Sequence, residues 1–490
     1  MEGVGNEYTD LRSPEYQAVI VVDYDDGRMF PLTESIPKCL LPIANRKLLA
    51  YQLDMLSKSN VIETFIVTPE EFEAPLKQFL AETHREGMNV EIISLPEMNG
   101  TTHALHAVSD RIRGDFFFIN SEVLSQVSLM DLANLHRLSI SDVTILFTIP
   151  NKDMLKDDVD QEYIGLTSEG RIIYKISTLE LEGEITLPKT LFQKLQSKPF
   201  SMRNDLLDIG IYLFSHWMID FIKDCYKRMS SIKNDLLPYL IQRQFQNQSY
   251  LENKISALKH RKRPLSFLET WLTTKEKNHY SSSLSSYQEP FNDPHHSVPN
   301  TPPPPGSLST SSVKTVGSFQ FEGDDNQDHL RVFGLVYSPY GTDSGSTAAA
   351  ATTPPTLLIS RVNTIQTYLT LNKEMPLITH TSRTTWPRLR NFSKKEMSLI
   401  GEHVDLGEQI AYRQCFIGNN CKIGKRTKLN NCVIMDGVVI GDNCIIQNSV
   451  ICEKVVIENN CNLNECNIGM GYKLTAGNEI RGESLAVGSN

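Results

Sequence analysis

Short apolar runs alternate with helical patterns along the first part of the chain. The aliphatic run at residues 19–22 predicts a buried parallel strand, because helices cover both faces of such a strand. Apolar residues at helical spacing predict helices at 48–59 and 72–85, and β-rich runs predict strands at 64–68 and 90–95. This alternation predicts a Rossmann-like α/β fold with a largely parallel sheet and right-handed crossovers.

The same kind of pattern continues to about residue 245. The predicted elements are a central strand within 115–124, a strand at 143–149, a hairpin at 163–176, a strand at 207–214 and a helix at 231–245. The hairpin is expected to turn near Gly170, and the last helix carries an apolar stripe through Leu236, Leu240 and Ile241. These elements extend the predicted α/β domain.

A different repeat governs the last 90 or so residues. An aliphatic residue recurs every five to seven positions and is often followed by Gly or Asn, as in Ile417-Gly418 and Ile423-Gly424. This hexapeptide pattern is typical of a left-handed parallel β-helix, in which the aliphatic points into a triangular prism. The Gly or Asn is expected to form the corner with a positive φ angle. A coil of about 18 residues gives roughly five coils, which suffices for a stable stack.

Composition divides the chain into four parts. These are a flexible tail at 1–15, the α/β domain at 16–275, a linker at 276–395 and the β-helix at 396–490. Within the linker, the Ser/Pro-rich segment 280–318 and the Gly/Ser/Thr/Ala-rich segment 341–355 bury too little apolar area to fold, so we expect disorder there. Residues 330–337 and 356–371 regain an apolar pattern and are expected to dock on one of the two domains.

Charge and hydropathy exclude several classes of protein. The formal net charge is −10 and the isoelectric point is about 5.7, which argues against a general binder of nucleic acid or anionic membranes. The basic run at 259–263 is more typical of a solvated surface. The N-terminal residues have no apolar core like that of a signal peptide, and no run approaches the ~18 apolar residues of a membrane span. We expect a cytosolic protein with no direct contact to nucleic acid or membrane.

The cysteines are concentrated in the repeat. Seven of the nine lie between Cys415 and Cys466, without any C-x-x-C spacing, and His403 is the nearest histidine in sequence. A zinc site is therefore the weaker interpretation. The better one is that cysteines such as Cys421 and Cys432 serve as small apolar residues in the repeat core.

The segment after the first predicted strand resembles the signature of the sugar-nucleotide pyrophosphorylases. That signature is a glycine-rich loop, G-G-x-G-T-R-L-x-P-L-T, followed by P-K-P-L. The residues in register with it are Arg28, Pro31, Leu32, Thr33, Pro37, Lys38 and Leu40. The resemblance implies a nucleotidyltransferase-like fold for the α/β domain.

The glycines of that loop are replaced. Asp23, Tyr24 and Asp26 stand at the three glycine positions, and Gly27 lies one place further on. A phosphate-binding loop brings backbone N–H groups close to the ligand, which requires residues without a Cβ and without negative charge. With Asp25, the segment carries three carboxylates, so we expect like-charge repulsion of a triphosphate.

The other family motifs are also altered. The segment 100–105, G-T-T-H-A-L, resembles the family's G-T-A-x-A-L. Glu122 stands where the family has an aspartate that binds Mg²⁺, Asp208 stands where an amide contacts the sugar, and 215–280 contains no W-x-D-x-G segment with the second metal carboxylate. Since Mg²⁺ requires near-ideal octahedral geometry, the longer Glu122 is expected to lose or alter metal binding. The predicted remnant nucleotide pocket comprises Gly27, Arg28, Lys38, Glu122 and Asp208. We predict no catalytic residue, no metal and no cofactor.

A narrower resemblance begins at residues 231–245. Their sequence is similar to the segment that ends the catalytically inactive nucleotidyltransferase-like domain in the gamma and epsilon subunits of eukaryotic translation initiation factor 2B. In that family the epsilon subunit adds an acidic helical-repeat domain after the β-helix, and this domain carries the exchange activity. Because the present chain ends at Asn490 without such a segment, the gamma-type pattern is expected.

The resemblance implies a non-catalytic subunit of a guanine-nucleotide exchange factor. Such a chain would pair directly with an epsilon-type subunit, join alpha, beta and delta-type subunits, and help position initiation factor 2 for exchange of GDP by GTP. The alternative is an active sugar-nucleotide pyrophosphorylase of the GDP-mannose type, which Arg28 and Lys38 favour and the altered loop and Glu122 oppose. A third hypothesis, a hexapeptide-repeat acyltransferase, needs a histidine base, for which His403 is the candidate.

Overall fold

The computed structural model describes most of the two predicted domains. The described residues are 16–83, 87–150, 161–195 apart from 182, 184, 186 and 188, 199–245, 330–338, 358–381, 389 and 391–487. The predicted tail, the basic run at 259–263 and the two low-complexity segments lie outside them. Among the described residues, no helix is both long and apolar enough to cross a bilayer.

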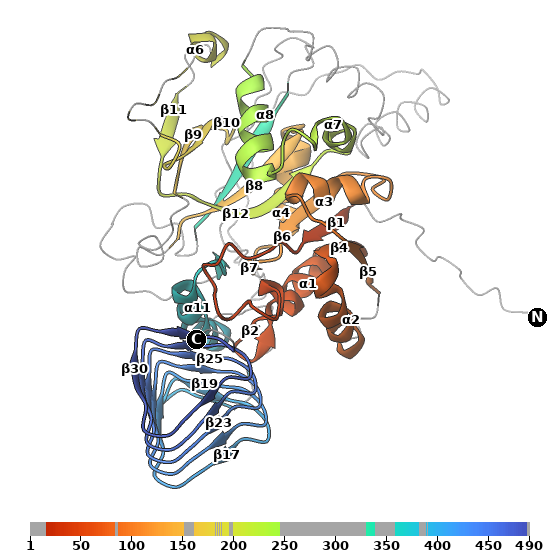
Figure 1. Ribbon diagram of the computed structural model, residues 1–490. Coiled ribbons are helices and arrows are strands. Elements are labelled where there is room, and N and C mark those ends of the chain that lie inside the picture. Colours follow the sequence, from red (N-terminus) through yellow and green to blue (C-terminus); the bar gives the residue numbers. More distant parts are fainter. Residues whose placement is uncertain are drawn as a thin grey trace, which may run out of the picture.

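A seven-stranded mixed sheet forms the centre of the N-terminal domain (Figure 1). In spatial order its strands are β13 (Val332–Tyr337), β8 (Val143–Thr148), β12 (Leu207–Phe214), β6 (Phe116–Asn120), β1 (Gln17–Val21), β4 (Glu63–Pro69) and β5 (Asn89–Leu95). β1 pairs in parallel with β4 and β6, whereas β12 is antiparallel to both of its neighbours. The predicted α/β fold with a largely parallel sheet is therefore confirmed.

Helices cover both faces of this sheet. α1 (Leu48–Lys58), α2 (Glu73–Glu82) and α4 (Leu129–Leu138) pack on one face, and α3 (Thr101–Val108), α7 (Met218–Cys225) and α8 (Leu237–Arg243) pack on the other. The central strand shows why both faces are apolar. Val19 and Val21 contribute to one core and Ala18 and Ile20 to the other, because successive side chains of a strand point to opposite faces.

Smaller elements surround the sheet. A second sheet contains β9 (Glu162–Thr167), β10 (Ile172–Ser177) and β11 (Phe200–Arg203), with α6 (Lys189–Leu195) before β11. β2 (Pro42–Ile43) and β3 (Arg46–Lys47) form a short hairpin, and η1 (Lys38–Leu40) and η2 (Glu70–Phe72) are 3₁₀ turns. The predicted helix at 231–245 begins as a π-helical turn, η3 (Ile232–Leu236), before α8. Ser231 caps this turn by accepting a hydrogen bond from the Asn234 N–H (3.1 Å).

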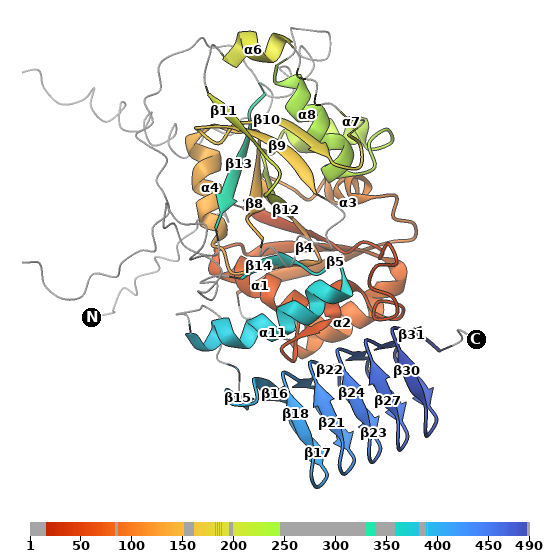
Figure 2. The ribbon, with the colours of Figure 1, turned by 90° about the vertical axis from the view of Figure 1, so that its left-hand side faces the viewer.

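The segment expected to be a linker contributes to the N-terminal domain. β13 pairs in parallel with β8 at the edge of the main sheet, and β14 (Ile359–Arg361) pairs antiparallel with β7 (Val123–Ser125). α11 (Ile365–Thr381) follows and lies between the sheet domain and the C-terminal coils (Figure 2). The chain thus returns to the first domain after the segment 246–329.

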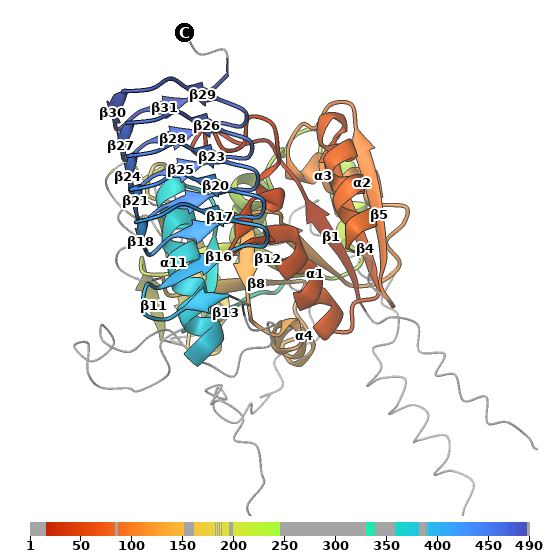
Figure 3. The same cartoon turned by 90° about the horizontal axis from the view of Figure 1, so that it is seen from below.

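The C-terminal domain is a parallel β-helix with three sheets. The first contains β15 (Phe392–Ser393), β16 (Ser398–Ile400), β19 (Phe416–Ile417), β22 (Val433–Ile434), β25 (Val450–Ile451), β28 (Asn467–Ile468) and β31 (Ser484–Leu485). The second contains β17 (Asp405–Leu406), β20 (Lys422–Ile423), β23 (Val439–Ile440), β26 (Val456–Ile457) and β29 (Lys473–Leu474). The third contains β18 (Ala411–Arg413), β21 (Lys428–Asn430), β24 (Ile445–Gln447), β27 (Asn462–Asn464) and β30 (Glu479–Arg481). Figure 3 shows the coils stacked on one another. Leu399 aligns with Phe416, and Phe416 with Val433, so one coil takes 17 residues rather than about 18.

The predicted positive φ angles at the corners of the β-helix occur at several asparagines and at glycines such as Gly437, but not at Gly418 and Gly424. Positive φ angles occur at His403 (56°), Asn420 (56°) and Arg426 (57°), whereas Gly418 and Gly424 do not have them. The glycines are needed for another reason, because a Cβ on Gly418 or on Gly424 would lie 2.4 Å from an atom of the next coil. The predicted role of these glycines as left-handed corners is therefore wrong; they permit close stacking of the coils.

The repeat cysteines fill the interior of the prism. Six of them, Cys415, Cys421, Cys432, Cys444, Cys461 and Cys466, are buried among the aliphatic residues of the coils. Cys452 is buried instead in the cluster that joins the coils to the first domain. The prediction that the cysteines act as small apolar core residues is confirmed.

An apolar cluster joins the two domains through α11. It includes Tyr368 and Leu371 of α11, Met29 of the first domain, and Phe416 and Val433 of the coils. The Tyr368 hydroxyl donates a hydrogen bond to the carbonyl of Pro42 (2.6 Å), which links α11 to the first domain. Burial of the ring and of the surrounding aliphatic side chains stabilises the arrangement of the two domains.

Candidate functional site

The loop after β1 is held by one carboxylate. Asp25 Oδ2 accepts hydrogen bonds from the backbone N–H groups of Gly27 (3.1 Å) and Met29 (3.0 Å) and from the Thr33 hydroxyl (3.1 Å). Its other oxygen, Oδ1, lies 2.8 Å from Lys38 Nζ. Asp25 therefore gathers two backbone donors, a hydroxyl and an ammonium group.

The charges of this loop are paired within the chain. Burial raises the pKa of Asp25, but Lys38 and the hydrogen bonds outweigh this effect, so the pKa of Asp25 lies below its usual value. Asp26 forms an ion pair with Arg28 Nε (2.5 Å). Burial raises the pKa of Asp23 above its usual value. The repulsion expected from three carboxylates is thus reduced, since two of them have cationic partners.

Glu122, at the position of the family's metal ligand, binds two cations of the chain itself. Its Oε1 accepts from Arg361 Nη2 (2.6 Å) and Nε (2.8 Å), and its Oε2 lies 3.3 Å from Lys38 Nζ. Burial raises the pKa of Glu122, but Arg361 and Lys38 reverse this and lower it to about 2. Since both carboxylate oxygens face cations, this arrangement does not fit a bound Mg²⁺ ion. The carboxylate of Glu122 thus binds a guanidinium group of the chain itself.

Lys38 is shared by these two carboxylates. Its side chain is 8% exposed, and burial alone would lower its pKa, whereas Glu122 and Asp25 raise it above the usual value. The ammonium group therefore stays charged. Its charge is balanced by the protein, so Lys38 offers less attraction to a phosphate than a lysine without acidic neighbours.

Asp208 lies beneath the site rather than in it. It is fully buried, accepts from the Tyr212 hydroxyl (3.1 Å) and the Gly210 N–H (2.9 Å), and lies 3.6 Å from Lys175 Nζ. Lys175 also binds Glu162 at 2.6 Å. These contacts form a buried ionic layer that supports Tyr212, whose ring faces the cavity described next.

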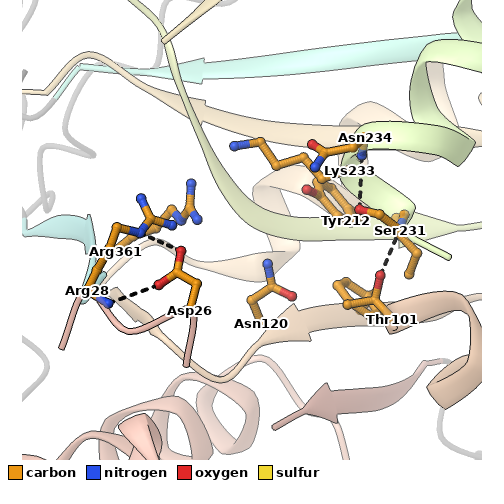
Figure 4. A pocket seen from close by; sticks show the side chains of 11 residues that line it. Asp26, Arg28, Thr101, Asn120, Tyr212, Ser231, Lys233, Asn234 and Arg361 are labelled. Atoms are coloured by element: carbon orange, nitrogen blue, oxygen red, sulfur yellow. Dashed lines mark hydrogen bonds and ion pairs between the residues drawn. The ribbon is translucent and has the colours of Figure 1, made fainter. Parts of the chain in front are cut away.

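A polar cavity of about 300 Å³ opens beside the loop. Its lining residues are Asp26, Arg28, Thr101, Phe118, Asn120, Tyr212, Ser231, Ile232, Lys233, Asn234 and Arg361. Figure 4 shows Arg28, Asp26 and Arg361 on one side of the cavity and Ser231, Lys233 and Asn234 on the other. Cationic groups thus face the cavity from two different parts of the chain.

The predicted remnant pocket is brought together only in part. Arg28 lines the cavity, and Lys38 and Glu122 lie next to it through their contacts with Asp25 and Arg361. Gly27 is exposed in the loop with φ +89°, a conformation that suits glycine.

Sequence reasoning missed several residues of the cavity, above all Arg361 and Lys233. Arg361 follows the low-complexity segments and matches no family motif, so the sequence carried no signal for it. Lys233 lies in a segment that was singled out, but as a helix.

Comparisons with known proteins agree with this two-part architecture. Residues 25–158 match the family model described as nucleotidyl transferase, and residues 388–480 match the model described as the EIF2B subunit epsilon LbH domain, a left-handed β-helix. The chain is 28% identical over 264 residues to translation initiation factor eIF2B subunit gamma of Dictyostelium discoideum, covering 48% of this chain and 59% of that protein. It is also 28% identical over 247 residues to the same subunit of Schizosaccharomyces pombe, covering 47% and 52%.

The resemblance to eIF2B gamma subunits is confirmed. The predicted fold class, a nucleotidyltransferase domain followed by a left-handed parallel β-helix, is confirmed as well. A second group of relatives includes mannose-1-phosphate guanyltransferase of Saccharomyces cerevisiae, 25% identical over 46% of this chain and 56% of that enzyme. The chain matches only slightly more than half the length of each of these relatives.

Proposed function

We propose that the chain is a non-catalytic subunit of the guanine-nucleotide exchange factor for translation initiation factor 2. In this role it binds an epsilon-type subunit directly, assembles with alpha, beta and delta-type subunits in the cytosol, and helps the epsilon-type subunit exchange GDP for GTP. The similarity to two eIF2B gamma subunits supports the assignment to a translation initiation factor.

The observation that carries the non-catalytic assignment is the ion pair between Glu122 and Arg361 (2.6 Å). Metal-assisted nucleotidyl transfer needs carboxylates that hold a divalent cation against the phosphates. Here the carboxylate at that position is neutralised by Arg361 and Lys38, and Asp25 engages the backbone donors of the loop. These contacts support loss of nucleotidyl transfer, and we assign no catalytic residue.

The proposed mechanism is binding rather than bond formation. An exchange factor accelerates nucleotide release because it binds the nucleotide-free form of its substrate more tightly than the nucleotide-bound form. A lasting contact with an epsilon-type subunit requires an interface of about 1,600 Å² or more. The cluster around α11 fixes the coils against the first domain and so presents both as one surface for such a contact.

The test is GDP release from purified initiation factor 2. Release is measured with the epsilon-type subunit alone, with this chain alone and with both in equal amounts. The proposal predicts co-purification of the two chains, clear acceleration by the pair and no activity of this chain alone. Absence of both co-purification and acceleration would refute it.

A second candidate is a mannose-1-phosphate guanyltransferase, which the other relatives and the cationic cavity favour. It predicts pyrophosphate release when the chain is incubated with GTP, mannose 1-phosphate and Mg²⁺. The expected result is no release above the level of a heat-inactivated sample. Measurable turnover would replace the first proposal by this one.

A further inference from the structure

Four hydrogen-bond donors of one loop converge on the Asp25 carboxylate. They are the N–H groups of Gly27 and Met29, the Thr33 hydroxyl and the Lys38 ammonium group, at 2.8–3.1 Å. The Asp25 side chain is 10% exposed, and its hydrogen bonds to Met29 and Thr33 are partly buried, whereas the bond to Gly27 lies at the surface. Backbone N–H groups, a hydroxyl and a lysine are also the groups with which nucleotide-binding loops hold a phosphate.

We propose that the Asp25 carboxylate is an internal substitute for a phosphate, so that the loop contains an anion-binding seat already filled by its own side chain. The seat consists of the four donors named above. A carboxylate and a phosphate both present oxygens to such donors, and charge-assisted hydrogen bonds to either anion are short and strong. The loop thereby folds and balances its charge without a ligand.

The neighbouring carboxylates make different contacts. Asp23 accepts from the adjacent Tyr24 N–H (2.8 Å), a purely local bond, and Asp26 turns to Arg28. Asp25 instead reaches forward to Met29 and Thr33, four and eight positions along the chain. The seat is therefore specific to Asp25 and does not follow from the acidic character of the loop.

The consequence is a latent anion site. Replacing Asp25 by alanine removes three heavy atoms and leaves four donors directed at the space they occupied. Buried donors without partners are costly, so a small anion from solution is expected to enter this space. Formate reproduces the lost carboxylate. Inorganic phosphate tests whether the seat also accepts the anion that nucleotide-binding loops hold.

The experiment measures the melting temperature of the full chain in sodium phosphate, sodium formate and sodium chloride at equal ionic strength. Three proteins are compared: the natural sequence, Asp25→Ala and the matched control Asp23→Ala. The control also removes one negative charge close to Lys38 but leaves the seat filled. Relative to chloride, phosphate and formate are each expected to raise the melting temperature of Asp25→Ala by at least about 2 °C more than that of the other two proteins, which report the general effect of each salt.

Each other outcome overturns the proposal in a defined way. Stabilisation by formate without phosphate would show a carboxylate site that is no substitute for phosphate. Equal stabilisation of all three proteins, or none, would show that the donors form no separate seat. If Asp25→Ala does not fold, Asp25→Ser is measured in the same way and judged by the same criteria. The inference rests on the proposed loss of nucleotidyl transfer, but the melting assay involves no exchange or transfer reaction, so its failure leaves the exchange-factor assignment to its own test.

Discussion

The pair between Glu122 and Arg361 gives a sharp prediction for stability. In Arg361→Met the guanidinium group is removed while the length of the side chain is nearly kept. Glu122 is 13% exposed and would retain Lys38 at 3.3 Å as its cationic partner. A buried carboxylate that loses its principal partner remains desolvated, and here Lys38 alone would offset that cost.

Two arguments give the expected loss in the free energy of unfolding of Arg361→Met. Breaking a buried ion pair by removing one partner costs about 3–5 kcal/mol. The lowering of the Glu122 pKa from 4.5 to about 2 corresponds to about 3.5 kcal/mol for the whole network, at about 1.4 kcal/mol per pKa unit. Because Lys38 remains, we expect Arg361→Met to reduce the free energy of unfolding by about 3 kcal/mol, the lower end of the first range.

The assay is urea unfolding of the full chain, followed by circular dichroism and intrinsic fluorescence. Arg113→Met is the control, because Arg113 is 78% exposed and pairs with Glu63 at the surface (3.1 Å), where a loss below about 1 kcal/mol is expected. The double variant Glu122→Gln/Arg361→Met should recover much of the loss, since no unpaired charge is then buried. A loss in Arg361→Met no larger than in the control would refute the reasoning.

Three further predictions concern other parts of the chain. Gly418→Ala would place a Cβ 2.4 Å from Asp436 Oδ1 in the next coil, so urea unfolding should show a loss of about 1–3 kcal/mol, and an unchanged midpoint would contradict the stacking role of this glycine. Tyr368→Phe removes the 2.6 Å hydrogen bond to the Pro42 carbonyl and should lower the free energy of unfolding by about 1–2 kcal/mol in the same assay, whereas full stability would show that this bond contributes nothing. Desolvation lowers the pKa of the buried His136 from 6.5 to about 3, so below about pH 6.5 the unfolded chain binds a proton that the folded chain does not. The free energy of unfolding should therefore fall by about 1.4 kcal/mol per pH unit as the pH drops below about 6.5. In His136→Gln the free energy of unfolding should depend less steeply on pH between about pH 6.5 and 5, and equal slopes for the two proteins would refute this.

Local patterns in the sequence were sufficient for most elements of the fold. The aliphatic run of β1 predicts a buried strand by itself. The aliphatic residues of the coils recur with the period of a hexapeptide repeat, which predicts that they are buried. The predicted coil length of about 18 residues is one residue too long, because the repeat does not consist of three equal hexapeptides. The prediction was wrong for Gly418 and Gly424 because a steric need for close stacking and a need for positive φ select the same residue.

The site was harder to predict because its decisive partners are remote in sequence. Arg361 and Glu122 are separated by 239 positions, and nothing local to either residue indicates the other. Asp25 was recognised as an added charge, but its hydrogen bonds to Gly27 and Met29 depend on the shape of the turn, which composition does not reveal. Ion pairing between distant segments is a tertiary property, so the motifs indicated which residues differ from the family pattern but not which partners they have in the fold.

The position of β13 at the edge of the main sheet has a consequence for folding during synthesis. β8 borders β13 on one side and β12 on the other, and β13 begins at Val332, 184 positions after Thr148, the last residue of β8. At a translation rate of about 5–20 residues per second, β8 therefore remains without its outer neighbour for roughly 9–37 s after its own synthesis. During this time it presents an unpaired edge, the kind of surface on which other chains add strands. The nascent chain therefore passes through a stage that is prone to aggregation, and protection of this edge by chaperones or by early assembly would improve its yield in cells.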